Sequence, residues 1–346
     1  MARLKKRLLK SKKAQAVESQ FNWIFIMIVG AVILGFFVFI VIKQKAASDA
    51  KFSGKVTKQL NTILVGAKVS SGTYQEIPTP EVDIRWECND YYIGPASQRL
   101  GNRVVFAPTF TEGNKLITWT LDWNVPFKIT SFLYITTPTI RYFVIAPSLE
   151  DKKAIEFYNK LPPKLNKQMR TIQEFNEGGI LFENDKHARF IFFNVGAIGT
   201  SFPLPPTFLN AQTSGLNIDT EQRQAQFLQA QGNQLTTSGP AISFYEDPVL
   251  FGAVFNDDPE TYSCLMQRAY IRLNLIASVY LEKLNTLAPE FESTSCEGYY
   301  LNNAALKNMI QATDTYPPSY GGVGDGVSSL KTANTKLQLQ SCPLIY

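Results

Sequence analysis

The sequence FNWIFIMIVGAVILGFFVFIVI, residues 21–42, decides how the rest of the chain is organised. At about 1.5 Å per residue it forms a helix of about 33 Å, which matches the hydrocarbon core of a bilayer. No Asp, Glu, Lys or Arg interrupts it, and Asn22 and Trp23 lie at its start, where an amphipathic ring suits the membrane interface. The sequence therefore predicts a transmembrane helix, because buried helices of soluble proteins seldom run this long without a polar face.

The charges on the two sides of this stretch differ. Residues 1–20 contain seven basic residues and one acidic residue, whereas Lys43, Lys45 and Lys51 follow the span with Asp49 between them. By the positive-inside rule, residues 1–20 form a basic cytoplasmic tail, and the chain after the span lies outside. We therefore expect a single-pass protein of the cell membrane.

Net charge limits the partners of the large outer part. The chain carries +5, but the part after residue 20 holds 27 basic and 28 acidic residues. That near-neutral balance gives no electrostatic basis for nucleic-acid binding, and the basic tail is suited to anionic lipid headgroups. The expected partners are the lipid bilayer, through residues 21–42, and a surface protein or a glycan.

The N-terminus allows two other interpretations. A cleaved secretory signal is disfavoured because the apolar run exceeds an ordinary signal core and no small-x-small site follows it. The segment KKAQAVES, residues 12–19, resembles the processing site of archaeal type IV pilin-like precursors, with a cut after Ala14, then Gln15, and Glu18 downstream. Glu18 would be the fourth mature residue, whereas those precursors usually have it fifth. The first 45 or so residues also resemble the anchors of uncharacterised archaeal single-pass membrane proteins.

After the span we expect a juxtamembrane helix or stalk over residues 43–75, because Val56, Leu60, Ile63 and Leu64 share a helical face. The Gly- and Pro-rich segment 70–80 ends it, and residues 76–346 form the extracytoplasmic domain. The fold class expected is α/β, with a mixed sheet, or α+β.

The spacing of apolar residues and the positions of Gly and Pro predict the helices and strands of that domain. Strands are expected at 82–88, 103–106, 115–123, 140–145, 179–182, 188–193, 241–245 and 251–255, with an edge strand at 337–346. Helices are expected at 149–161, capped by Ser148, in the Gln-rich segment 220–231, at 260–284, capped by Asp258 with Pro259 first, and at 299–312.

The four cysteines, Cys88, Cys264, Cys296 and Cys342, all lie in the outer part, and none forms a CxxC pair. An even number in an oxidising exterior predicts two disulfides, with three pairings open. Scattered cysteines and a single histidine, His187, do not fit a zinc site. No metal or cofactor is expected.

Catalytic motifs are lacking in the sequence. His187 lies in the charged sequence NDKHAR, which is typical of an exposed turn, and no GxSxG, Walker or HExxH motif occurs. The glycines of 321–326 follow a Pro-rich segment instead of a strand, which predicts a flexible loop. Asp257, Asp258 and Glu260 begin a helix, where capping explains them.

One strand combines aromatic and polar groups that could contact a sugar: Trp119, Asp122 and Trp123. The rings share a strand face, however, and such a face more often belongs to the core. The sequence therefore predicts a membrane-anchored extracytoplasmic binding or assembly protein that is not an enzyme. The alternatives are a pilin-like filament subunit, a glycan-binding surface domain and an ectoenzyme.

Overall fold

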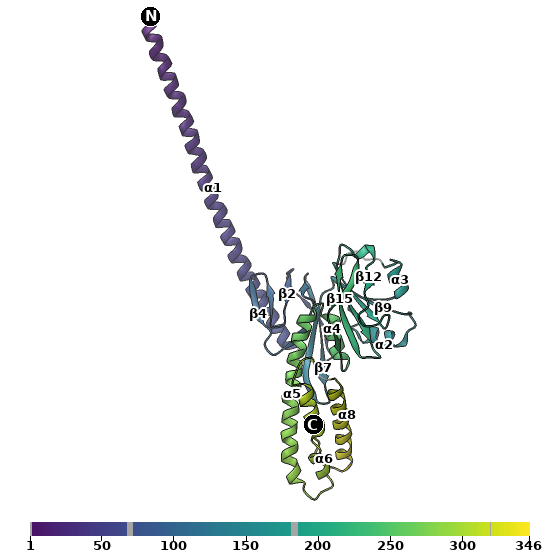
Figure 1. Ribbon diagram of the computed structural model, residues 1–346. Helices are drawn as coiled ribbons and strands as arrows, with labels where there is room; N and C mark the ends of the chain where they lie inside the picture. The colour runs from purple at the N-terminus through teal and green to yellow at the C-terminus, as the bar shows by residue number, and fades with distance from the viewer. Residues whose placement is uncertain (1, 68–71, 181–185, 319) are drawn as a thin grey trace. The chain divides into compact units, whose positions relative to one another are not determined.

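The structure, a computed structural model, describes residues 2–67, 72–180, 186–318 and 320–346. The chain divides into two compact units, Met1–Lys55 and Val56–Tyr346. The described residues form a mixed α/β protein with three sheets and one long N-terminal helix (Figure 1).

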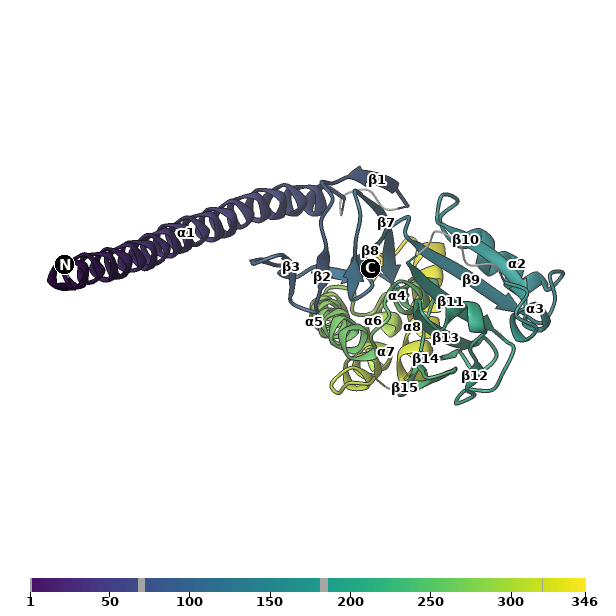
Figure 2. The ribbon, with the colours of Figure 1, turned by 90° about the horizontal axis from the view of Figure 1, so that it is seen from above.

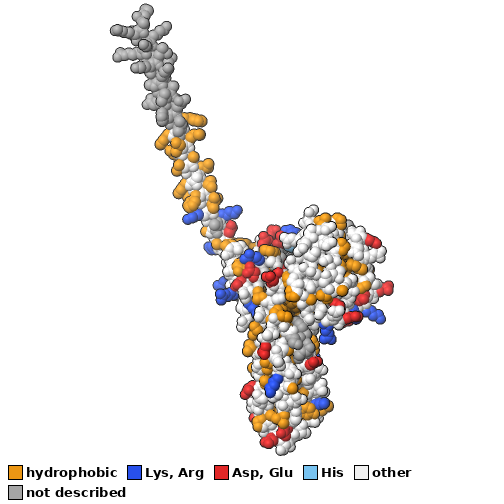
Figure 3. Space-filling model, viewed as in Figure 1, with side chains coloured by type: hydrophobic (Ala, Val, Ile, Leu, Met, Phe, Trp, Pro, Cys, Tyr) orange, Lys and Arg blue, Asp and Glu red, His pale blue; other side chains and the backbone are white. Residues whose placement is uncertain are grey.

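The helix α1 runs without a break from Ala2 to Ala67. Among the described residues, one helix is long and apolar enough to cross a membrane, and it lies within Phe25–Gly66. None of the described residues covers its apolar stretch: Phe25 is 66% exposed and Val41 is 62% exposed, and hydrophobic side chains surround the helix there (Figure 3). This stretch is a possible membrane anchor.

The last turns of α1 belong to the larger unit. Val56, Leu60 and Leu64 are buried in one apolar cluster with Trp86 and Tyr91, as expected from their shared helical face. The Tyr91 hydroxyl also donates to the carbonyl of Thr57 at 2.8 Å. The last turns of α1 therefore form part of the core of the larger unit.

Two four-stranded sheets follow. One has the order β1 (Tyr74–Pro78), β7 (Lys115–Asn124), β8 (Lys128–Thr136) and β5 (Val104–Phe106). The other has the order β4 (Ala96–Arg99), β3 (Asp90–Ile93), β2 (Ile84–Trp86) and β6 (Phe110–Thr111). In β2 and β3 alternate side chains are buried, which is the pattern of strands with one solvated face.

The third sheet positions the candidate site. Its order is β10 (Lys167–Thr171), β9 (Ile140–Ala146), β11 (His187–Phe193), β13 (Gln212–Asp219), β14 (Gln224–Gln231), β15 (Gln234–Ser243) and β12 (Phe202–Pro203). The first four strands are parallel, and Figure 2 shows the strands of this sheet from above. The chain passes from β9 to β10 on one side of β9 and then crosses to β11 on its other side. The connections that leave the carboxyl ends of β9 and β11 therefore run in opposite directions along the sheet.

Helices cover both faces of this sheet. Phe157 of α2 (Lys152–Lys160) packs into the largest apolar cluster, with the buried helix α4 (Asp247–Phe255), whereas Phe175 of α3 (Ile172–Asn176) packs into the cluster on the opposite face. Burial on both faces explains why β9 and β11 are nearly continuous apolar runs.

The chain after residue 258 is mostly helical (Figure 1). It comprises α5 (Pro259–Glu290), α6 (Glu297–Leu301), α7 (Ala304–Ala312) and α8 (Tyr320–Leu339). Asp258 caps α5 as predicted, because its carboxylate accepts from the Thr261 N–H at 2.7 Å. Tyr262 packs against the sheets, and Leu284 packs in the same cluster as Tyr300 and Leu337.

Several predictions of secondary structure and capping were wrong. The segment expected as a helix at 220–231 is mostly strand β14, because pairing with β13 and β15 outweighs the helix propensity of its glutamines. The segment expected as a strand at 251–255 ends the helix α4, whose all-round burial removes the helical period. The first turn of α2 is capped by Asp151, which accepts from the Ala154 N–H at 2.8 Å, and not by Ser148.

Another correction concerns the glycine-rich segment 321–326, which is helical and lies in the first turns of α8. A Cβ atom at Gly326 would overlap the Met309 side chain, so glycine allows α7 and α8 to approach closely there. The edge strand expected at 337–346 is absent: α8 continues to Leu339 and a turn follows it. The strand expected at 179–182 is not formed at Gly179 and Ile180, and its remainder lies outside the described residues.

Candidate functional site

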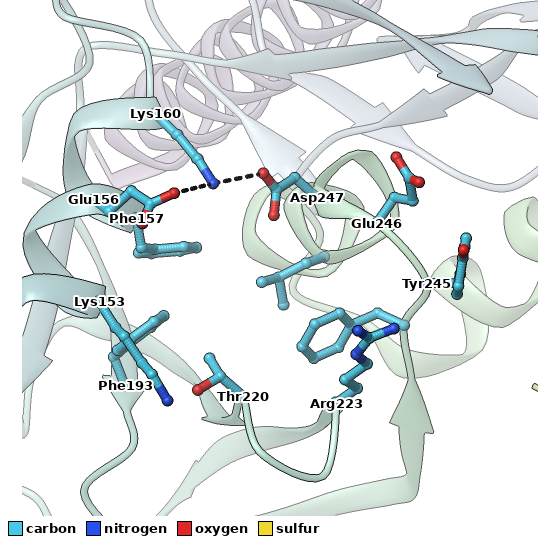
Figure 4. A pocket seen from close by; sticks show the side chains of 12 residues that line it. Lys153, Glu156, Phe157, Lys160, Phe193, Thr220, Arg223, Tyr245, Glu246 and Asp247 are labelled. Carbon is cyan, nitrogen blue, oxygen red and sulfur yellow. Dashed lines mark ion pairs between the residues drawn. The ribbon is translucent and has the colours of Figure 1, made fainter. Parts of the chain in front are cut away.

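The carboxyl ends of several strands of the large sheet meet at one edge. Strand β14 is antiparallel to both β13 and β15, so β13 and β15 end at the same edge as β11. A pocket of about 480 Å³ lies there (Figure 4). Its walls come from α2, the end of β11, the turn after β13, the segment after β15 and α4, and they include Lys153, Glu156, Phe157, Lys160, Phe193, Thr220, Arg223, Phe244, Tyr245, Glu246, Asp247 and Leu250.

Local hydrogen bonds hold the turn that carries Thr220 and Arg223. The Asp219 carboxylate accepts from the N–H groups of Glu221 and Gln222, both at 2.9 Å. Asn194, with a left-handed φ of 55°, donates from Nδ2 to the Thr220 hydroxyl and accepts from the Thr220 N–H, each at 2.9 Å. Asn tolerates this conformation better than most residues. The end of β11 therefore fixes the position of Thr220.

Lys160 forms an ion pair across the upper part of the pocket. Its Nζ lies 2.8 Å from Glu156 Oε1 on α2 and 2.9 Å from Asp247 Oδ2 on α4 (Figure 4). The hydrogen bonds to these two carboxylates raise the pKa of Lys160, and the bond to Lys160 lowers the pKa of Glu156. The charge of Lys160 is thus matched within the protein.

The other two cations of the pocket are less well matched. Lys153 Nζ is 3.9 Å from Glu221 Oε1, and both side chains are largely exposed. The Arg223 guanidinium lies 5.9 Å from the Tyr245 ring, and the described chain places no carboxylate within 4.0 Å of it. Lys153 and Arg223 lie on the two sides of Thr220 (Figure 4). The Thr220 hydroxyl itself donates to Asn194 Oδ1 at 3.1 Å, so this end of the pocket can accept an anionic group between the two cations.

Aromatic side chains form the apolar part of the wall. The Phe157 and Phe193 rings lie 4.9 Å apart and are both buried, whereas Phe244 and Tyr245 are partly exposed. Burial, followed by the charge of Glu246, raises the pKa of Tyr245, so this phenol is neutral at physiological pH. An apolar wall with a few polar groups is the usual composition of a small-molecule pocket.

A second hollow of about 620 Å³ adjoins the pocket where the connections of β9 and β11 diverge. Lys153 lines both hollows, and the second is also lined by Asp151, Lys152, Asn194, Asp219 and Glu221. In open α/β sheets, ligands bind outside the carboxyl ends of the strands at such a point. The position of the pocket in the fold and the types of residue that line it are therefore both typical of a ligand-binding site.

His187 lies at the opposite edge of the sheet. It is the first residue of β11 and not part of an exposed turn as predicted, because its side chain is only 14% exposed and its Nε2 lies 3.4 Å from Glu112 Oε1. A cavity of about 360 Å³ beside it contains Arg189, Asp257 and Asp258. Asp258 is the α5 cap, and Asp257 accepts from the N–H and the hydroxyl of Thr109, both at 2.7 Å.

Arg189 in this cavity has a structural role. It is 3% exposed and donates to the carbonyls of Gly215, Ala253, Val254 and Asn256 at 2.6–3.3 Å. Three of these carbonyls lie at the C-terminus of α4, where a helix presents unpaired acceptors and partial negative charge. Burial lowers the pKa of Arg189 to about 10, which still leaves it charged at neutral pH.

The structure resolves the cysteine pairing. Cys88 is bonded to Cys264, and Cys296 is bonded to Cys342. The first bond joins the chain after β2 to the second turn of α5, and the second joins the start of α6 to the segment after α8. Among the described residues, no group of three or more His, Cys, Asp and Glu side chains could hold a metal ion.

The strand residues considered for sugar binding are mainly core. Trp119 is 7% exposed and Trp123 is fully buried, 5.4 Å from the Phe132 ring. Neither ring presents a face for a sugar. The Asp122 carboxylate accepts hydrogen bonds from Lys128 at 2.8 Å and from Ser131 at 2.7 Å.

The candidate processing site lies within the helix α1, which contains Ala14, Gln15 and Glu18. Processing after Ala14 stays a prediction.

The pocket residues were not predicted from the sequence. The helix that carries Lys153 and Lys160 was expected, but Thr220 and Arg223 were assigned to a helix instead of a turn between strands. A hairpin interpretation of Asp219–Arg223 would have placed both at the edge where α2 begins. Searches of protein-family models, curated proteins and solved structures find no match to this chain.

Proposed function

We propose that this chain is a membrane-anchored extracytoplasmic binding protein that holds an anionic ligand, or an anionic segment of a partner, in the pocket at the carboxyl edge of its large sheet, without catalysing a reaction. The observation that carries the proposal is the pair of weakly matched cations, Lys153 and Arg223, beside an aromatic wall.

Three features support the anchor and its orientation. The apolar helix is long enough to cross a bilayer, and the preceding residues are strongly basic. The two disulfides are typical of an oxidising compartment outside the cytoplasm. Protease added to intact cells should therefore remove the larger unit; complete protection of that unit would contradict the orientation.

The composition of the pocket supports binding without catalysis. Its described lining contains no cysteine, serine or histidine nucleophile beside a base, and its Lys160 is held by two carboxylates. The chain's single histidine lies at the opposite edge of the sheet. The ligand we expect carries a carboxylate or phosphate for the cations and a ring or sugar face for Phe244 and Tyr245.

Ligand-observed NMR tests this with the full chain in detergent micelles. The probes are phenyl phosphate and phenol, which differ only in the anionic group. Phenyl phosphate should receive more saturation transfer from the protein, and Arg223→Gln or Lys153→Gln should reduce the difference. Arg85→Gln, at an exposed arginine outside the pocket, is the control. Equal signals from the two probes, or no effect of either pocket variant, would contradict the proposal.

A pilin-like subunit is the second candidate, because α1 is one uninterrupted helix from the basic tail to the folded unit. Assembly of that kind would follow removal of residues 1–14 and would use the apolar helix. The intact mass of the protein isolated from its own membrane decides this: a mature chain that begins at Gln15 supports the filament subunit, and an uncut chain supports the permanent anchor.

A further inference from the structure

Helix α5 exposes an apolar stripe that is left uncovered by the part of the chain that the structure describes. Ile271, Leu275 and Val279 are 52%, 62% and 67% exposed, although the opposite face of the same helix, with Leu273 and Ala277, is buried. Hydrophobic side chains are visible on the solvent side of this helical part (Figure 3). Single exposed apolar residues are ordinary, but three in line on one helix form a contact surface.

The charges beside the stripe are arranged symmetrically. Ile271 and Val279 are each four residues from Leu275, and Arg268 and Glu282 are each seven residues from it. Spacings of four and seven keep all five side chains on one helical face. Along α5 the stripe therefore has a positive end, three apolar residues and a negative end, with Leu275 at its centre.

We propose that this stripe, residues 268–282 of α5, is the interface with a second copy of the same chain, and that the two α5 helices pair antiparallel about a two-fold axis at Leu275. In that arrangement Leu275 contacts Leu275 of the second copy, and Ile271 contacts Val279 of the second copy. Arg268 lies opposite Glu282 of the second copy, twice over by symmetry. A parallel pairing would instead place Arg268 beside Arg268 and Glu282 beside Glu282, which is repulsive.

Arg268 and Glu282 can each still form the ion pair with the second copy, because each makes only one weak side-chain hydrogen bond to the described residues of its own chain. Arg268 uses one N–H group, from Nη1, for a hydrogen bond of 3.3 Å to the Gly101 carbonyl. Glu282 is exposed and accepts one long bond of 3.5 Å from Asn285. Three apolar side chains per copy make a small interface, so we expect association that depends on concentration.

Single-cysteine crosslinking tests the axis directly, because all four native cysteines are paired. Under mild oxidation of the full chain in detergent, Leu275→Cys should crosslink to itself. Val279→Cys alone should not, because the two positions would lie about 12 Å apart along the helices and a disulfide spans at most about 7 Å between Cα atoms. A mixture of Ile271→Cys and Val279→Cys should crosslink. Leu339→Cys, 81% exposed on α8, is the control for random collision.

Sedimentation of the full chain supplies a second measurement. The native chain should shift from monomer to dimer as concentration rises, and Leu275→Asp should remain monomeric with an unchanged thermal midpoint. Glu282→Arg should weaken the dimer, and adding Arg268→Glu should restore it. Phenyl phosphate binding should be the same in Leu275→Asp and the native chain, so failure of either proposal is distinguishable from failure of the other.

Three results would overturn the proposal. The native chain could remain monomeric without a crosslink at position 275. Val279→Cys could crosslink to itself, which indicates a parallel pairing. Leu275→Cys could crosslink in membranes to a different protein, which assigns the stripe to another partner.

Discussion

Replacing Arg189 by Met should destabilise the protein more than replacing any exposed arginine. The guanidinium is buried and donates to four carbonyls: Asn256 at 2.6 Å, Ala253 at 2.8 Å, Gly215 at 3.0 Å and Val254 at 3.3 Å. These bonds join strand β11 to the end of α4 and to strand β13. Met fills a similar volume but donates nothing, so the carbonyls would stay buried without a donor.

The expected loss of stability follows from the number of carbonyls that lose their donor. A buried acceptor left unsatisfied costs about 1 to 3 kcal/mol. Removing the guanidinium also removes the cost of burying its charge, which offsets part of the sum over four carbonyls. We expect a net loss of about 3 to 5 kcal/mol in the free energy of unfolding. Arg189→Lys should lose less, because an ammonium keeps the charge but cannot span four acceptors.

Urea unfolding of the full chain in detergent, followed by tryptophan fluorescence, measures these differences. Arg223→Met is the matched control, since Arg223 lies at the rim of the pocket with no carboxylate partner within 4.0 Å among the described residues. It should change stability by about 0.5 kcal/mol or less. A loss below about 1 kcal/mol for Arg189→Met, or equal losses for Arg189→Met and Arg223→Met, would refute the role assigned to this residue.

Three further predictions follow from other parts of the fold. Trp123→Ala should cost about 3 to 5 kcal/mol of stability in the same assay, because the ring is fully buried; a nearly neutral variant would mean that the ring is not core. Alkylation without reduction should leave all four cysteines unmodified by mass spectrometry, and any alkylated native cysteine would argue against its disulfide. Burial raises the pKa of Glu112, but the hydrogen bond and charge of Lys186, with the charge of His187, outweigh it and lower the pKa. The stability from Glu112 is therefore present above its unfolded-state pKa of about 4.3 and is lost as the pH falls through the lower folded-state pKa. Between about pH 5 and pH 3 the unfolding free energy of the native chain should fall more steeply than that of Glu112→Gln, and parallel curves would contradict this.

The sequence alone determined the features that depend on local pattern. An uncharged apolar run of 22 residues has one favourable environment, so the candidate anchor was identifiable without a structure. The cap and first residue of α5, Asp258 and Pro259, were predicted because capping uses neighbours in the chain. Even the helical face of Val56, Leu60 and Leu64 follows from spacing alone.

Only the tertiary structure decided the rest, because the deciding partners are distant in the sequence. Gln224–Gln231 is a strand since β13 and β15 satisfy its backbone, and Asp247–Phe255 is a helix since neighbours surround it on every side. The disulfide pairing joins residues 176 and 46 positions apart. The pocket likewise joins Lys153, Thr220 and Asp247 from three elements, which meet because parallel strands bring their carboxyl ends to one edge.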